Sequence, residues 1–313
     1  MIKSKFIMMI GIVASGKSTY AKLLASKENA ILLSSDQLRV ELYNDINNIE
    51  HNDVIFETIH KRTKEYLRQG KNVIMDATNL SYKRRKAFLD ELKKINCIKE
   101  CYLMATPYEL CLQQNKLRDR YVPEFVIKQM YKSICVPQHF EGWDKIHIIY
   151  NTEDIKFDFF KLFDNLDCID QDNPYHTLTI GCHCNKCRDI LVDILRDNNI
   201  SVYSKEGINL LMAAQLHDIG KQFTKQFKNS KGEDTDIAHY YNHQLVSAYD
   251  SLFYLRELKY EQEDILNIIK YIAFHMQPYF IKTEKSRNKF IKLVGQDFYD
   301  KLMLLNQADK LAK

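Results

Sequence analysis

The chain has 313 residues, of which 45% are apolar, so it is long enough for two domains and too apolar for a disordered protein. Residues 1–150 carry 24 Lys and Arg against 17 Asp and Glu, whereas residues 151–313 carry 21 against 24, within a net charge of +4. A basic half suits a polyanionic substrate and an acidic half suits a domain that binds cations, but ordinary surface variation explains the difference equally well.

No stretch reaches the roughly 18 apolar residues of a membrane-spanning helix, so we expect no membrane segment. The apolar residues near the start are interpreted as a first strand rather than a signal peptide, because a glycine-rich loop follows them directly. The eight cysteines form no disulfide framework and mostly stand singly in apolar segments. We therefore expect a cytoplasmic protein with reduced thiols.

Residues 1–150 alternate short apolar runs with amphipathic stretches, which is typical of a parallel sheet with helices on both faces. The predicted strands are Phe6–Ile10, Ala30–Leu33, Asn72–Met75, Ile98–Met104 and Lys145–Ile149. The predicted helices are Lys17–Ser26, Val54–Gln69, Tyr82–Ile95, Pro107–Leu117 and Glu124–Ser133. The pattern predicts an α/β domain over residues 1–150.

The pattern changes after about Tyr150. Residues 151–172 are acidic and aromatic and are predicted to form a connecting segment that contains a helix. From there on, only helical periodicity is evident, so we expect an all-α domain over residues 173–313. The predicted helices are Cys187–Asn198, Gly207–His217, Asn242–Leu258, Glu261–His275 and Asp297–Leu311.

The segment GIVASGKST over residues 11–19 has the P-loop pattern GxxxxGK[ST] between a predicted strand and a predicted helix. Its glycines let backbone N–H groups face phosphates, and the helix that follows presents its positive end to the same anion. Lys17 is expected to contact the β- and γ-phosphates of ATP, and Ser18 to ligate Mg²⁺. The expected nucleotide-binding residues are Gly11, Ser15, Gly16, Lys17, Ser18 and Thr19.

Polar residues follow the next two strands, at the edge where a parallel sheet binds its ligands. Asp36 can accept the proton of an attacking hydroxyl, and Arg39 can hold the acceptor's phosphate. The alternative is a helix-capping Asp36 with a solvated Arg39. Asp76 is expected to hold Mg²⁺ through water, with Thr78 and Asn79 orienting the acceptor, and capping of the next helix is the alternative.

Two arginines, Arg118 and Arg120, lie between predicted helices, just before the sequence VPE. They can close over the transferring phosphoryl group and stabilise the charge that develops on it. The alternative is an ordinary solvated helix end.

The P-loop, the motifs SSDxxR and DATN, and the arginine segment followed by VPE resemble the polynucleotide 5′-kinase family over about residues 5–150. The resemblance implies that Asp36 is the general base and that Arg39 holds the acceptor phosphate. It also implies that Arg118 and Arg120 contact the donor phosphates. Small P-loop kinases in general share the P-loop and the arginine segment, so a different acceptor stays open.

The second half places ligand-type side chains in apolar segments. His217 and Asp218 adjoin at the end of a predicted helix, and a buried carboxylate there needs a cation or a partner. Imidazole and carboxylate together suit Mn, Fe, Ni, Co or Zn without choosing among them. The other candidates are His183, His239, His243, His275 and Asp309.

This set resembles the HD phosphohydrolase superfamily over about residues 173–313, whose pattern is a His, the His-Asp pair and a distant Asp. Members that hold two metals have two further histidines. The resemblance implies that Asp218 bridges two ions. It places His183, His217 and Asp309 on one ion, and His243 and His275 on the other.

A metal ion lowers the pKa of a bound water, so hydrolysis of a phosphoester is expected to need Asp218, with Lys221 holding the substrate phosphate. His176 lies in a segment that resembles the start of the HD domain in bacterial end-healing proteins. It is expected either to touch the substrate or to have no role. Cys182, Cys184 and Cys187 lack a second ligand pair nearby, so they are expected to line the helix that carries His183 rather than to bind a structural zinc.

Together the two resemblances imply an enzyme that heals nucleic-acid ends. Its activities would be an ATP- and Mg²⁺-dependent 5′-OH kinase and a 2′,3′-cyclic phosphodiesterase or 2′(3′)-phosphatase. Its partners would be RNA or DNA ends and a separate ligase, because no ligase pattern is visible. The alternatives are a small-molecule kinase fused to a nucleotidase, and a non-catalytic nucleotide sensor, against which the complete ligand set argues.

Overall fold

The computed structural model describes residues 3–48, 50–174 and 177–313. Contacts between Cα atoms divide the chain into two compact units, Met1–Asp154 and Ile155–Lys313. The first unit is a parallel sheet with helices and the second is helical, which confirms the predicted fold classes. The expected limits of a separate connecting segment, residues 151–172, stay a prediction.

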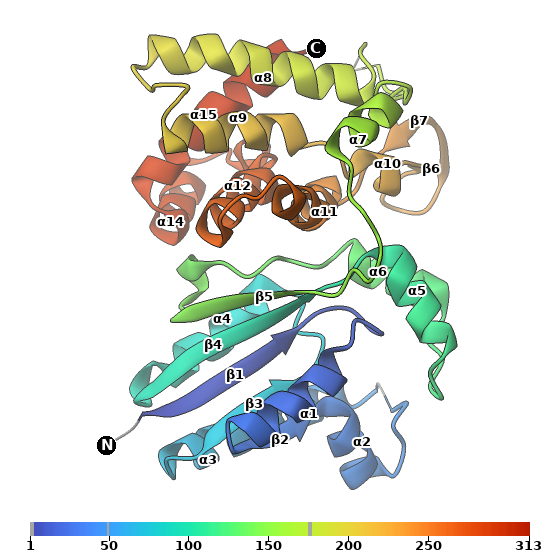
Figure 1. Cartoon of the computed structure of the whole chain (residues 1–313), viewed down its shortest axis with the longest axis vertical. Helices are drawn as coiled ribbons and strands as arrows, with labels where there is room; N and C mark the ends of the chain where they lie inside the picture. The colour runs from blue at the N-terminus through green and yellow to red at the C-terminus, as the bar shows by residue number, and fades with distance from the viewer. Residues whose placement is uncertain (1–2, 49, 175–176) are drawn as a thin grey trace. The chain divides into compact units, whose positions relative to one another are not determined.

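The sheet of the first unit has five parallel strands in the order β2-β3-β1-β4-β5 (Figure 1). The strand order reverses at β1, because β3 and β4 pair with it on opposite sides. In such sheets the ligand crevice lies beyond the carboxyl ends of the strands at this reversal. The strands are β1 (Ser4–Ile10), β2 (Ala30–Ser34), β3 (Asn72–Asp76), β4 (Cys97–Ala105) and β5 (Lys145–Tyr150), each at a predicted position.

Helices follow the strands as the alternating pattern predicts. One helix, α2, was missed in the prediction because its segment is short and lacks a clear apolar period. The predicted helix 82–95 ends earlier, with a 3₁₀ turn over Leu92–Lys94. The helices are α1 (Lys17–Lys27), α2 (Ser35–Tyr43), α3 (Asn52–Arg68), α4 (Tyr82–Glu91), α5 (Tyr108–Lys116) and α6 (Glu124–Tyr131), and a second 3₁₀ turn covers His139–Glu141.

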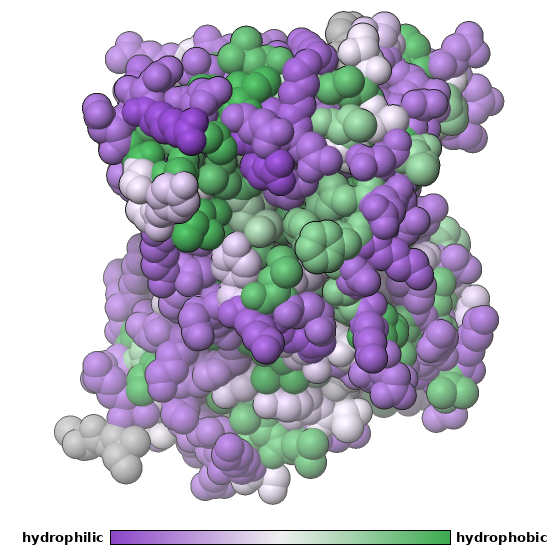
Figure 2. All heavy atoms as spheres, turned by 45° about the horizontal axis from the view of Figure 1, so that its top comes forward, coloured by the Kyte–Doolittle hydropathy of each residue, from purple (hydrophilic) through white to green (hydrophobic). Residues whose placement is uncertain are grey.

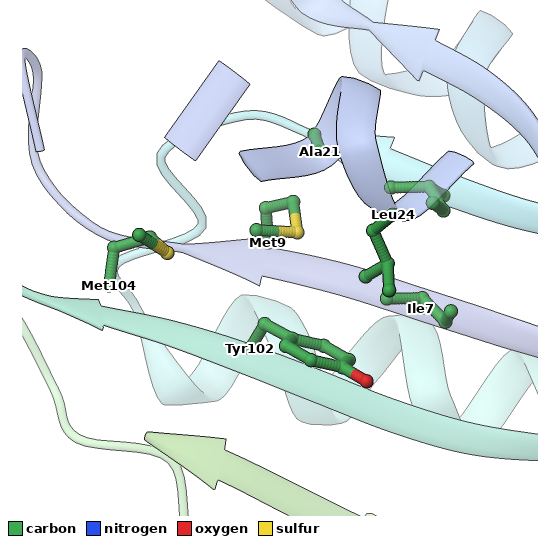
Figure 3. Packing of buried hydrophobic residues seen from close by; sticks show 7 residues of the cluster. Ile7, Met9, Ala21, Leu24, Tyr102 and Met104 are labelled. Carbon is green, nitrogen blue, oxygen red and sulfur yellow. The ribbon is translucent and has the colours of Figure 1, made fainter. Parts of the chain in front are cut away.

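Both faces of the sheet are covered, which explains why its strands are nearly continuously apolar. On the face opposite α1, Phe6 contacts Phe88 of α4, with ring centroids 5.3 Å apart. Ile7 and Met9 alternate with Phe6 along β1, so they point to the other face of the sheet and pack against α1. The α1 core consists of Ile7, Met9, Ala21, Leu24, Ile74, Tyr102 and Met104 (Figure 3).

A buried ion pair fastens α4 and the loop after β3 to the segment before β5. Nε and Nη2 of Arg85 donate to the two carboxylate oxygens of Glu141 at 2.8 and 2.7 Å, and both side chains are fully buried. Nη1 of Arg85 donates to the carbonyls of Asn79 and Leu80, both at 2.9 Å. Glu141 also accepts from Nε1 of Trp143 at 3.1 Å. The network leaves no charge of the pair unmatched, which is the condition under which such a pair is tolerated.

Replacing Glu141 with alanine is expected to destabilise the first unit by about 3–5 kcal/mol, because it leaves the Arg85 guanidinium buried without its partner. Urea unfolding followed by the fluorescence of Trp143, the only tryptophan of the chain, reports on this unit. Glu41→Ala is the control, because its pair with Arg62 is exposed and contributes at most about 1 kcal/mol. A loss below 1 kcal/mol for Glu141→Ala contradicts the expectation.

The second unit is built from helices and one short hairpin (Figure 1). The helix predicted over 187–198 begins earlier, at Ile180, where Thr179 caps it by accepting from the backbone N–H of Cys182. The helices are α7 (Phe159–Leu166), α8 (Ile180–Asp197), α9 (Lys205–Leu216), α10 (Lys221–Thr224), α11 (His243–Glu257), α12 (Gln262–Phe274), α13 (Gln277–Phe280), α14 (Glu284–Val294) and α15 (Gln296–Leu311), and the antiparallel strands are β6 (Gln226–Lys228) and β7 (Asp234–His239).

No helix in the described part of the chain combines the length and the apolar character that crossing a bilayer requires. On the face drawn in Figure 2, hydrophilic residues predominate and apolar residues form separate patches.

Candidate active sites

The P-loop adopts the backbone conformation that its sequence predicts. Gly16 has a left-handed φ of 84° where the loop turns into α1, a conformation that favours glycine. Nζ of Lys17 donates to the carbonyl of Ile12 at 2.7 Å, inside the loop. Burial lowers the pKa of Lys17 to about 8, although Asp76 opposes this shift. A bound polyphosphate would supply the negative charge that this buried ammonium lacks.

A cavity of about 540 Å³ lies over the P-loop and brings the predicted kinase residues together. Gly11 does not line it, but its N–H donates to the carbonyl of Thr78 at 3.1 Å and so joins the P-loop to the loop after β3. The predicted residues that line the cavity are Ser15, Gly16, Lys17, Ser18, Thr19, Asp36, Arg39, Asp76, Arg118 and Arg120.

Asp36 lies between two arginines from different parts of the chain. Its Oδ1 accepts from Nη1 of Arg39 at 2.7 Å and from Nη1 of Arg120 at 3.0 Å. The capping alternative for Asp36 is wrong, because Ser34 is the N-cap of α2 and accepts from the N–H of Gln37. The solvated alternative for Arg39 is also wrong, because this residue is buried. The carboxylate therefore faces the cavity with two cations beside it.

Asp76 is the last residue of β3 and is buried at the cavity wall. It does not cap the next helix, because the N-cap of α4 is Ser81, five residues later. The Asn79 side chain donates to the carbonyls of Met9 and Ala77, so it braces the loop. Its predicted contact with the acceptor stays untested.

Two further features of this cavity concern its arginines. Arg118 is exposed at the cavity, and its positive charge contributes to the lowered pKa of Lys17, so the two cations face the same space. Arg84 of α4 also lines the cavity and was missed in the sequence analysis. No motif distinguishes Arg84 from the neighbouring Arg85, whose side chain points into the core. The cavity therefore gathers Arg39, Arg84, Arg118 and Arg120 in addition to Lys17.

In the second unit, four of the predicted metal ligands, all histidines, surround the carboxylate of a fifth, Asp218. Oδ2 of Asp218 lies 3.4 Å from Nε2 of His183 and 3.3 Å from Nε2 of His217. Oδ1 of Asp218 lies 3.2 Å from Nε2 of His243 and 3.6 Å from Nε2 of His275. The two oxygens of one aspartate thus face two separate histidine pairs.

Asp309 completes the first of these groups. Its Oδ1 lies 3.2 Å from Nε2 of His183 and 3.6 Å from Nε2 of His217. Its other oxygen accepts from the hydroxyl of Tyr279 at 2.8 Å. This division leaves one oxygen of Asp309 directed at the histidines and holds the carboxylate in place.

The four histidines share one orientation. Nδ1 of each lies near a backbone carbonyl, at 3.1 Å for His183, 2.7 Å for His217 and 2.8 Å for His243 and His275. A carbonyl only accepts, so each Nδ1 carries a proton, and each Nε2 faces the centre of the cluster. The carbonyls belong to Ala312, Ala214, Tyr240 and Ile272.

The donor set requires positive charge at its centre. Nε2 of His183 and of His217 lie 3.2 Å apart, and Nε2 of His243 and of His275 lie 3.1 Å apart. Such neighbouring lone pairs repel unless a proton or a metal ion lies between them. Oδ1 of Asp218 is buried and has no hydrogen-bond partner among the described residues. The cluster therefore fits divalent metal ions.

The acidic members of the cluster are ionised, as metal ligands must be. Burial opposes the charge on Asp218, but the charges of His217 and Lys221 hold the pKa of Asp218 well below its usual range. Hydrogen bonds to His183 and His217 lower the pKa of Asp309 in the same way against the effect of burial. Two sets of three ligand atoms lie within 4.8 Å of one another: His183, His217 and Asp309, and His217, Asp218 and His275.

A cavity of about 540 Å³ opens onto this cluster and is lined by Asp218, His243, His275 and Asp309. Lys221 lines it as well, and its Nζ contacts Oδ2 of Asp218 at 2.6 Å and Oε1 of Gln171 at 2.7 Å. In the structure Lys221 therefore neutralises the shared carboxylate. Contact between Lys221 and a substrate phosphate stays a prediction.

The turn that contains Gly220, just after His217 and Asp218, packs closely against α11. A side chain at Gly220 would place Cβ 2.5 Å from the backbone nitrogen of Ser247 and 2.6 Å from the carbonyl of His243. Only glycine lets α10 approach the start of α11 this closely. The glycine two residues after Asp218 thus helps to bring His243 to the cluster.

The remaining sequence predictions for this unit have different outcomes. Cys184 and Cys187 are buried in α8 with His183, and neither metal-type group among the described residues includes a cysteine. His239 stacks on Tyr241 and is not a member of the cluster. His176 lies outside the described residues.

Comparison with protein families assigns each half. Residues 6–137 match the model of an AAA domain, and residues 180–313 match the model of the HD domain. The first match contains the P-loop and the arginines of its cavity. The second contains the six residues of the cluster around Asp218, called here the metal-type cluster: His183, His217, Asp218, His243, His275 and Asp309.

Similar proteins include a curated L-seryl-tRNA(Sec) kinase from Methanococcus maripaludis, which is 23% identical over 249 residues. That match covers 74% of this chain and 93% of the relative. Among solved structures, the Pnkp1/Rnl/Hen1 RNA repair complex has a chain that is 20% identical, with a TM-score of 0.36, over 42% of this chain and 43% of that one. A gluconokinase from Sinorhizobium meliloti is 12% identical, with a TM-score of 0.36, over 48% of this chain and 84% of that one.

Proposed function

We propose, from the premise that this chain joins a P-loop kinase domain to an HD phosphohydrolase domain, that it heals the ends of broken nucleic acids. In this proposal the first unit phosphorylates a 5′-hydroxyl with ATP and Mg²⁺. The second unit removes a 2′,3′-cyclic phosphate or a terminal 2′(3′)-phosphate with the help of one or two divalent metal ions. Sealing of the healed ends falls to a separate ligase.

One observation supports the proposal: an arginine-lined cavity over the P-loop and a cluster of six ligand-type side chains around Asp218 occur on the same chain. In the kinase reaction, Asp36 takes the proton of the hydroxyl, Arg39 holds the acceptor's phosphate, and Asp76 holds Mg²⁺ through water. The relative from Methanococcus maripaludis is named for an acceptor carried on tRNA. That name supports an acceptor hydroxyl attached to RNA.

In the hydrolase reaction, the cluster would hold one or two divalent metal ions, and such ions would activate a water for attack on the phosphate. Asp218 and Asp309 would supply the negative charge of the site, while the backbone carbonyls at Nδ1 keep the four imidazoles oriented. Lys221, which contacts Asp218 at the cavity, would be placed to hold the substrate phosphate. The metal-binding residues are His183, His217, Asp218, His243, His275 and Asp309.

Arg118 and Arg120, the two arginines between α5 and α6, provide a prediction of their own. Arg118→Ala and Arg120→Ala are each expected to lower kcat more than they raise the KM for ATP, because both cations face charge that develops in the transition state. Steady-state kinetics with a fixed acceptor measure both constants. Leu117→Ala is the matched control, because this neighbour of Arg118 is exposed and does not line the cavity. A change in KM alone for both arginine variants refutes the assignment.

A second candidate is a small-molecule kinase fused to a nucleotidase. The volume of each cavity, about 540 Å³, lies within the usual range for small-molecule sites and favours it. It differs from the first proposal in the acceptor, which would be a free nucleoside or another metabolite.

One assay separates the two candidates. The purified protein receives a labelled oligonucleotide with 5′-hydroxyl and 2′,3′-cyclic phosphate ends, together with ATP and Mg²⁺ or Mn²⁺. End healing predicts a gained 5′-phosphate and an opened or lost terminal phosphate. Phosphorylation of nucleosides without any change in the oligonucleotide supports the second candidate and contradicts the first.

A further inference from the structure

Two exposed aromatic residues stand at the cavity of the HD unit. Tyr241 and Phe280 line the same cavity as Asp218, His243 and His275, and they are 39% and 65% exposed. Exposing a phenylalanine ring to water is unfavourable, so rings of this kind beside a reaction centre indicate a ligand with an apolar face.

The two rings are tied closely to the cluster. Tyr241 precedes His243 by two residues, so their Cα atoms are at most about 7 Å apart. Phe280 ends α13, the short helix that follows His275. Each ring thus comes from a segment next to a histidine of the second pair, and both rings line the cavity that opens onto the cluster.

Tyr241 is held in a fixed orientation. Its ring stacks on the imidazole of His239 with centroids 5.5 Å apart and planes 5° apart, and its hydroxyl lies 3.4 Å from Nδ1 of His239. Because His239 is not in the metal-type cluster, this contact serves the tyrosine and not the ions. A preoriented, partly exposed ring is what a flat ligand needs for stacking.

Resting on the proposed end-healing function, we propose that Tyr241 and Phe280 bind the terminal unpaired nucleobase of the strand whose phosphate is hydrolysed at the HD site. Aromatic stacking accepts any base, because each base has a π-face, so this contact selects for an unpaired end and not for a sequence. A base that is already stacked within a duplex must first be freed, so single-stranded ends bind better.

The test compares two short single-stranded oligonucleotides that end in the same 3′-phosphate. One carries its terminal base and the other has an abasic terminal sugar. With the full-length protein and Mn²⁺, the abasic end is expected to show a KM at least about fivefold higher at similar kcat, the lower end of what one base stack contributes. Tyr241→Ala and Phe280→Ala are expected to raise the KM of the base-carrying end by a similar factor and to leave the abasic end unchanged.

The controls keep the outcomes distinct. Tyr241→Phe and Phe280→Tyr retain a ring and are expected to restore the wild-type KM. Tyr203→Ala removes a tyrosine that is 88% exposed away from the cavity and is expected to change nothing. Equal KM values for both ends in the wild type, or equal effects of Tyr241→Ala on both, overturn the stacking inference alone. Hydrolysis of neither end by the wild type overturns the end-healing function as well.

Discussion

Replacing Asp218 with alanine is expected to remove both metal ions and to abolish hydrolysis, while kinase activity stays unchanged. The reason is geometric, because one oxygen of Asp218 faces His183 and His217 and the other faces His243 and His275. We expect the hydrolysis rate to fall at least 100-fold, since even an outer partner of a metal ligand typically contributes about 10- to 100-fold. Elemental analysis of protein purified after growth with Mn, Fe, Ni and Zn measures the metal per chain.

The variants that accompany Asp218→Ala separate a shared ligand from an ordinary one. His243→Ala removes a ligand of one ion only and is expected to retain the other ion and some activity. Asp193→Ala is the matched control, because this aspartate of the same unit is exposed and pairs with Arg196. A wild-type metal content in Asp218→Ala contradicts the bridging role, and a metal content near zero in the wild type contradicts the metal site altogether.

The kinase cavity was largely predictable because its parts are local in the sequence. The P-loop needs only a strand, a helix and the residues between them, and Lys17 and Ser18 occur at fixed places in that motif. Asp76 ends β3 and Asp36 lies two residues after β2, and parallel strands end at one edge of the sheet, so their convergence follows from the fold. The sequence pattern does not predict which side chains form pairs, such as Asp36 with Arg120, which is 84 positions away.

The metal-type cluster could not be predicted from local motifs in this way, because apart from the adjacent His217 and Asp218 its members come from well-separated segments. Composition indicated that ligand-type side chains lie in apolar segments, but their grouping came from the resemblance to the HD superfamily. Periodicity alone does not say which oxygen of Asp218 faces which pair. That division depends on side-chain torsions, which the carbonyls behind each Nδ1 and the hydroxyl of Tyr279 help to fix.

Most of the missed elements are short, but helix α14, with 11 residues, was missed as well. Strand β6 has three residues and helix α13 has four, too few for an apolar period to emerge. Helix α13 carries Tyr279 and Phe280, and strand β7 of the hairpin leads to Tyr241, and all three residues line the cavity. Tyr279 also contacts Asp309. Local propensity does not predict such short segments, so the residues proposed to contact the substrate base were the least visible in the sequence.

Lys17→Ala and Asp36→Asn are each expected to lower the rate of phosphoryl transfer to a 5′-hydroxyl at least about 100-fold, for different reasons. Lys17 is the buried cation of the P-loop, so its loss removes charge from the phosphate site, and ATP affinity falls as well. Asparagine at position 36 keeps an oxygen for Arg39 and Arg120 but does not accept a proton, which a general base must do. Radiolabel transfer to an oligonucleotide and ATP binding measure the two effects.

The contrast between these variants decides whether Asp36 is the base or only an anchor for the two arginines. An anchor is largely preserved in Asp36→Asn and lost in Asp36→Ala, so near-wild-type transfer by the asparagine variant contradicts the base. A base is lost in both variants, whereas ATP binding persists in both, because Asp36 is not in the P-loop. Asp45→Asn is the control, because this exposed aspartate lies after α2 and does not line the cavity. Hydrolysis by the HD unit is expected to be unchanged in all of these variants, because the two reactions use separate residues.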